Sequence, residues 1–192
     1  FNGEQMIKLN LHECELKMFC KLKRNFSSAG FDIAGTTGVC FAKTDNDILY
    51  LDWTLMSWET KEQRKLFETI YKDFGTLISD EDIIVIEDTH VRFNPAVALL
   101  LTRMGAFLMA QAINKNLNFE LIGPVSARSK VGINQKKIPK GKSKEYVADW
   151  LRTTLEIDMK ENNVADAIVL ALYGLIEGCE FKKMKAKKKR KK

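Results

Sequence analysis

The stretch SAGFDIAGTTG, residues 28–38, predicts a core strand at 28–34 that runs into a glycine-containing turn. Stretches rich in Val, Phe, Ile, Leu and Trp follow at 39–43 and 48–56 and predict two more strands. Asp32 stands within the first strand, between two large apolar residues. A carboxylate that is buried there loses its hydration, and a divalent cation is one partner that compensates, although alternation also allows Asp32 to face solvent.

Helices and strands alternate along the rest of the chain, to judge from the spacing of apolar residues. The predicted elements are a helix over 60–78, a strand over 83–86, a helix over 95–114, a strand over 119–122, and helices over 143–156 and 164–176. The order βββαβαβα indicates an α/β fold with a five-stranded mixed sheet flanked by helices.

A single domain accounts for the chain, because 192 residues are too few for two domains with separate sheets and no linker divides them. We predict that this domain spans 26–180, between an N-terminal extension or expression remnant at 1–25 and a basic tail at 181–192. No apolar run or signal peptide indicates a membrane, so we expect the protein in the cytoplasm. Four scattered Cys and only two His argue against a thiolate or imidazole metal site, so any metal would be Mg²⁺ or Mn²⁺ held by carboxylates.

The positive charge of the protein is concentrated in two places. The net charge is +6, but residues 181–192 hold nine Lys or Arg and no acid, which leaves 22 basic against 25 acidic residues in the rest. A second basic run without acids consists of Arg128, Lys130, Lys136, Lys137, Lys140, Lys142 and Lys144. A polyanion such as DNA would explain both runs, and a solvated tail and loop is the alternative.

Two further acids stand where a site is expected. Glu87 ends a buried strand, whereas Asp88 would point to the opposite side, so only one of the two can share a site with Asp32. Asp166 shares a helix face with Asn163. Each acid has a capping role as its alternative. Together, Asp32, Glu87 and Asp166 are typical of a site where hard cations cleave a phosphodiester.

An Asp before a Gly-rich turn, an Ile-Glu on a later strand and Ala-Asp-Ala-Ile on the last helix resemble the RuvC family of Holliday junction resolvases. The resemblance covers residues 28–178 and is greatest to the RuvC-like enzymes of lactococcal phages. It implies a ribonuclease H-like fold, a homodimer and paired cutting of four-way junctions, with Mg²⁺ as cofactor and Mn²⁺ as a substitute. Forks and flaps are further expected substrates, and the bacterial host cytoplasm is the expected location.

The resemblance also implies residue roles. Asp32, Glu87 and Asp166 match three of the family's four catalytic, metal-binding acids, and Asn163 stands where the fourth would be. Asn163 is then a tolerated ligand, Glu161 substitutes for it, or metal binding is weak. The other implied roles are Lys130 and Lys142 near the scissile phosphate, His90 and Phe93 at the junction centre, and the helix over 95–114 as dimer face or core helix. The charge of the basic run separately predicts DNA contacts by Arg128, Lys136, Lys137, Lys140 and Lys144.

Two rival interpretations remain open at this point. The run from Phe31 to Gly38 also resembles the first phosphate-binding turn of actin-like ATPases and sugar kinases, although the second domain of that group has no counterpart after residue 110. A catalytically inert protein that binds junctions is the other alternative, because Asn163 carries no charge.

Overall fold

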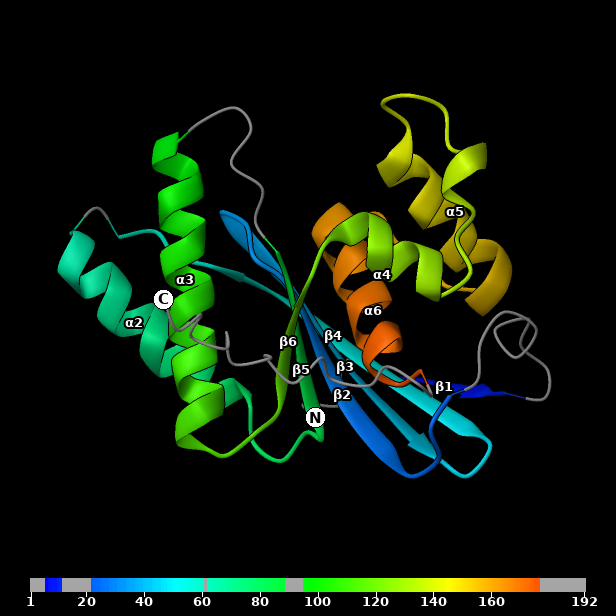
Figure 1. Ribbon diagram of the computed structural model, residues 1–192, viewed down its shortest axis with the longest axis horizontal. Helices are drawn as coiled ribbons and strands as arrows, with labels where there is room; N and C mark the ends of the chain where they lie inside the picture. Colours follow the sequence, from blue (N-terminus) through cyan, green and yellow to red (C-terminus); the bar gives the residue numbers. More distant parts are fainter. Residues whose placement is uncertain (1–5, 12–21, 61, 89–94, 177–192) are drawn as a thin grey trace, which may run out of the picture.

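A six-stranded mixed sheet forms the centre of the protein in the computed structural model, which describes residues 6–11, 22–60, 62–88 and 95–176 (Figure 1). The strands are β1 (Ile7–Asn10), β2 (Phe26–Asp32), β3 (Thr36–Asp45), β4 (Ile48–Ser57), β5 (Ile83–Glu87) and β6 (Phe119–Ile122). Their order across the sheet is β1-β4-β3-β2-β5-β6. The β2–β5 and β5–β6 pairs are parallel and the others antiparallel, so the predicted α/β class and mixed sheet are confirmed.

The predicted number of strands was wrong by one. Strand β1 pairs with β4 from Ile7 opposite Leu51 to Asn10 opposite Ile48, within residues 1–25, which were predicted to be an extension outside the domain. An edge strand of four residues is too short to show a periodic pattern, and its position depends on a partner strand far along the chain.

Helices cover both faces of the sheet. Helices α2 (Gln63–Leu77) and α3 (Pro95–Asn114) lie on one face, and α6 (Asn162–Gly174) lies on the other, with α4 (Pro124–Lys130) and α5 (Ser143–Leu155) beside it (Figure 1). Along each central strand, successive side chains point alternately to the two faces of the sheet and pack against the helices there. Phe31 and Ile86 belong to the cluster under α2 and α3, whereas Ile83 and Val85 belong to the cluster under α6.

Helix α6 lies directly on the sheet because glycines face it. A Cβ atom at Gly30 would stand 2.3 Å from the carbonyl oxygen of Ala167, and one at Gly38 would stand 2.1 Å from that of Asn163. Any side chain at these two positions would push the helix away from the sheet. The glycines of β2 and β3 therefore determine how closely α6 packs against the sheet.

Helix α3 and strand β6 have the predicted bounds, but the region between β6 and α5 was not predicted. It contains α4 and a short 3₁₀ helix, η1 (Gln135–Lys137). The apolar residues of this region are few and show no regular spacing that would predict a helix. Helix α6 also begins at Asn162, two residues before its predicted start.

Helix α3 buries only one of its apolar faces. Met104, Leu108 and Ala112 pack into the core, while Val97, Leu99 and Ile113 are exposed. By length and composition, α3 alone among the described helices could cross a membrane, a criterion that core helices of soluble proteins also meet. The expectations of a dimer face on this helix and of no membrane contact stay predictions.

Candidate metal centre

Asp32 and Glu87 end two neighbouring parallel strands. Phe31 of β2 is in register with Ile86 of β5, so the next residues along each strand, Asp32 and Glu87, come side by side at the same edge of the sheet. Their neighbours Phe31 and Ile86 point into the cluster under α2 and α3. By alternation both carboxylates point to the opposite face, where α6 lies.

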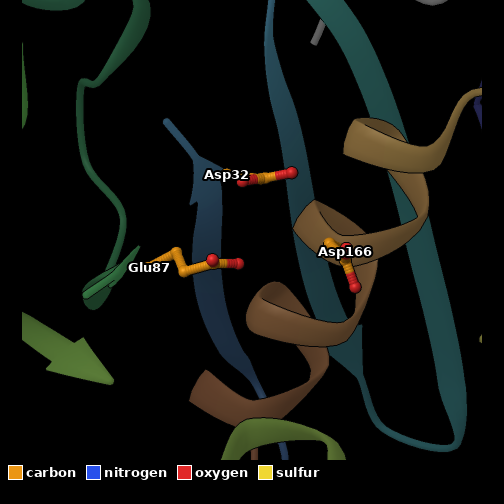
Figure 2. A group of neighbouring side chains, drawn as sticks. All are labelled: Asp32, Glu87 and Asp166. Carbon is orange, nitrogen blue, oxygen red and sulfur yellow. The ribbon is translucent and has the colours of Figure 1, made fainter. Parts of the chain in front are cut away.

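Asp166 approaches the same point from α6. One carboxylate oxygen from each of Asp32, Glu87 and Asp166 lies within 4.8 Å of the other two (Figure 2). The predicted convergence of these three acids is therefore confirmed. Asp88 and Glu161 are not members of this group, so Glu161 does not take the place of the fourth acid in this arrangement.

The carboxylates form a set of hard oxygen donors on three separate elements, with no Cys or His among the described members of the group. Oxygen donors of this kind suit Mg²⁺ and Mn²⁺ and not a soft metal. The residues present therefore fit the cation that the sequence predicts.

Arg128 lies against this cluster. Its Nη2 and Nε atoms donate to Oδ1 of Asp166 over 2.7 and 3.3 Å, and both side chains are only about a tenth exposed. The charge of the basic run predicts that Arg128 contacts DNA, and the structure places it against a buried acid. The burial of Arg128 could not be predicted from the sequence, because α4 itself was not predicted.

Burial, together with the charges of the neighbouring acids, raises the pKa values of two carboxyl groups. Burial and the charge of Asp166 raise the pKa of Asp32 to about 7, against the opposing effect of Lys144 and Arg128. Burial and the charges of Asp32 and Asp166 raise the pKa of Glu87 to about 8. The positive charges of Arg128 and Lys144 thus do not fully neutralise the negative charge of the three acids. The acids therefore still bind protons readily, or another cation in their place.

The amide nitrogen of the Asn163 side chain is hydrogen-bonded to the sheet. Its Nδ2 atom donates to the carbonyl oxygen of Thr36, at the start of β3, over 2.5 Å. This contact leaves the side-chain oxygen as the atom that Asn163 can offer to a cation. Its predicted role as a ligand stays a prediction.

The lysines of the basic run are exposed, and all of them lie on α4, η1, α5 or the turns between them. These are Lys130, Lys136, Lys137, Lys140, Lys142 and Lys144. Lys142 forms an ion pair with Glu145 over 2.8 Å, whereas it is Lys144 whose charge acts on Asp32 and Glu87. The predicted roles of these lysines stay predictions, and His90, Phe93 and the basic tail lie outside the described residues.

The raised pKa values predict how stability depends on pH. In the unfolded chain Asp32 and Glu87 titrate near 3.8 and 4.5, so the folded protein binds more protons up to about pH 8. The stability that these protons contribute is fully present below about pH 4, falls as the pH rises, and is lost once the pH has passed through about 7 and 8. We expect the melting temperature of the metal-free protein to fall between about pH 6 and pH 9.

Added Mg²⁺ should raise the melting temperature more at about pH 9 than at pH 6, because protons compete with the cation for the same oxygens. Thermal melts with EDTA or MgCl₂ across this range measure both effects. A metal-free protein that becomes more stable as these two groups ionise would contradict the charge arrangement.

Comparison with solved structures identifies the fold. Two structures of RuvC from Thermus thermophilus, one of them in complex with a Holliday junction substrate, each match this chain with a TM-score of 0.63 and 14% sequence identity. The matches cover 77% of this chain, and 91% and 92% of the RuvC chains. No protein-family model and no curated protein matches the sequence. The chain therefore has the ribonuclease H-like fold of RuvC, as predicted.

Proposed function

We propose that this protein is a metal-dependent endonuclease that cuts branched DNA, with four-way junctions as its principal substrate and forks and flaps as further ones. The observation that carries the proposal is the convergence of Asp32, Glu87 and Asp166 at one sheet edge. The RuvC-like fold supports it, and so does the complex of one such neighbour with a Holliday junction.

In the proposed reaction the acids would bind the metal and the lysines would bind the DNA. Asp32, Glu87 and Asp166 hold divalent cations, with the side-chain oxygen of Asn163 as a further ligand. Such cations, when bound, supply a nucleophilic water and neutralise charge on the leaving oxygen. The exposed lysines from Lys130 to Lys144 attract the phosphate backbone, which adds affinity that does not depend on sequence.

The oligomeric state, the identity of the metal, the location of the protein and its contacts at the junction centre are part of the same proposal. We propose a homodimer, with Mg²⁺ as the natural cation and Mn²⁺ as a substitute, acting in the cytoplasm of a bacterial host if a phage encodes the protein. His90 and Phe93 would contact the junction centre, and the relation to enzymes of lactococcal phages stays a prediction.

Cleavage of synthetic DNA tests the proposed function. A labelled four-way junction, a fork, a flap and a linear duplex of the same sequence are incubated with the protein and MgCl₂, MnCl₂ or EDTA. We expect paired cuts in the junction with either metal, none with EDTA and none in the duplex. Binding of the junction without cleavage would favour the inert binding protein, and ATP binding without junction cleavage would favour the actin-like alternative.

Lys144 is expected to affect turnover more than binding. Its removal in Lys144→Ala takes a positive charge from the site, so kcat should fall by roughly tenfold or more, while the affinity for the junction changes little. Because Lys144 lowers the pKa of Asp32 and of Glu87, the pH of half-maximal activity should also move upward. Lys137→Ala, an exposed lysine on η1, is the matched control. An effect on affinity alone would reduce Lys144 to an electrostatic contact.

A further inference from the structure

The Arg128–Asp166 pair places a fixed positive charge where the proposed function requires cations. Both hydrogen bonds from the guanidinium fall on Oδ1 of Asp166. In the described part of the chain, no donor is found for Oδ2. The pair therefore engages one oxygen of Asp166 and leaves the other for a cation.

Arg128 is held in this position by its own backbone and neighbours. Its carbonyl oxygen accepts a hydrogen bond from the backbone N–H of Ile133 over 2.9 Å. The adjacent Ala127, together with Val131 and Ile133, is buried in the same core cluster as α6. Because α4 is packed against α6 in this way, the backbone of Arg128 is held beside Asp166, and the two hydrogen bonds to Oδ1 hold its guanidinium there.

The net negative charge of the site is too small to neutralise two divalent cations. Asp32, Glu87 and Asp166 contribute three negative charges when ionised, and Asn163 contributes none. The buried guanidinium cancels one of them. The remaining two negative charges are neutralised by one divalent cation, whereas two cations would leave an excess of positive charge beside Arg128.

We infer that Arg128 takes the place of one divalent cation, so that the free protein binds a single Mg²⁺ or Mn²⁺ tightly. The inference rests on the proposed function, and it adds that the charge needed for a second cation comes from the phosphodiester of the DNA. Arg128 acts through Asp166 and is thus a positioning residue and not a DNA contact.

Counting bound Mn²⁺ in the absence of DNA tests the inference. Titration of the full chain followed by electron paramagnetic resonance is expected to give one tight site per chain. Arg128→Met should gain a second Mn²⁺ site or bind the first about tenfold more tightly, because it restores one negative charge. Its metal-free form should also melt at a lower temperature and recover when Mn²⁺ is added. Arg128→Lys keeps the charge and should bind one ion.

Asn163→Asp provides the same test without removing a buried charge. It adds a negative charge at the edge of the cluster and leaves the Arg128 pair intact, so a second Mn²⁺ site is expected. Two equally tight sites in the unaltered protein, no tight site, or an unchanged number and affinity in both Arg128→Met and Asn163→Asp would overturn the inference.

Junction cleavage measured on the same samples separates the two proposals. A protein that cuts junctions but binds two ions tightly without DNA contradicts only the role of Arg128. A protein that binds one ion, responds to the variants as expected and cuts no DNA contradicts only the proposed function.

Discussion

Replacing Asp32 with asparagine is expected to abolish cleavage of the junction and, at the same time, to stabilise the metal-free protein. Cleavage should fall by about 10³-fold or more, because the variant loses a carboxylate that holds the cation. Stability should rise because Asp32 is buried beside Asp166, which raises its pKa to about 7. At about pH 8 the neutral amide removes this repulsion and should raise the melting temperature by roughly 2–4 °C, the effect of about 1 kcal/mol in a chain of this size.

The opposite signs of the two effects make this prediction specific. A variant that is inactive because it misfolds would melt earlier, whereas this one should melt later and lose its response to Mg²⁺. Asp88→Asn is the matched control, since Asp88 follows Glu87 directly but is exposed and outside the acid cluster. Full activity of Asp32→Asn would remove the basis of the proposed function.

Replacing Gly30 with alanine is expected to unfold or strongly destabilise the protein. The new Cβ would stand 2.3 Å from the carbonyl oxygen of Ala167 and 2.4 Å from the backbone nitrogen of Ala171. Both are backbone atoms of α6, so the whole helix must move, at a cost of about 3 kcal/mol or roughly 6–12 °C in melting temperature. Asp166 moves with the helix, so Mn²⁺ affinity should fall as well.

Gly35→Ala is the control for this substitution. A Cβ at Gly35 meets no atom within 4 Å, so the same chemical change should leave the melting temperature and Mn²⁺ affinity nearly unaltered. Thermal melts and Mn²⁺ titrations of both variants provide the comparison. If Gly30→Ala were as stable as Gly35→Ala, the close approach of α6 to the sheet would be wrong.

Much of the fold and the acidic part of the site could be predicted. Helix α3 and strand β6 have the predicted bounds, because the apolar pattern of each is local and clearly bounded. The convergence of Asp32 and Glu87 follows once both are placed at the ends of parallel strands. The choice of Glu87 over Asp88 followed from alternation and is confirmed by the group of acids.

The surroundings of the acids could not be predicted in the same way. Arg128 and Asp166 are 38 positions apart in the sequence, and charge alone made Arg128 one member of a basic run. The role of Lys142 near the scissile phosphate, which the resemblance implies, stays a prediction. The structure adds that the charge of Lys144, two residues along, lowers the pKa values of Asp32 and Glu87. Burial and the direction of a side chain decide such roles, and neither can be read from the charge of a residue.

The sequence by itself determined the α/β class, most of the helices and strands, and which acids could hold a cation, because these depend on residue type and on spacing within one element. Only the tertiary structure decided that Ile7–Asn10 adds a sixth strand, that glycines bring α6 onto the sheet, and that Arg128 is buried against Asp166. These features arise from contacts between residues far apart in the chain, and a contact of that kind leaves no period in the sequence of either partner.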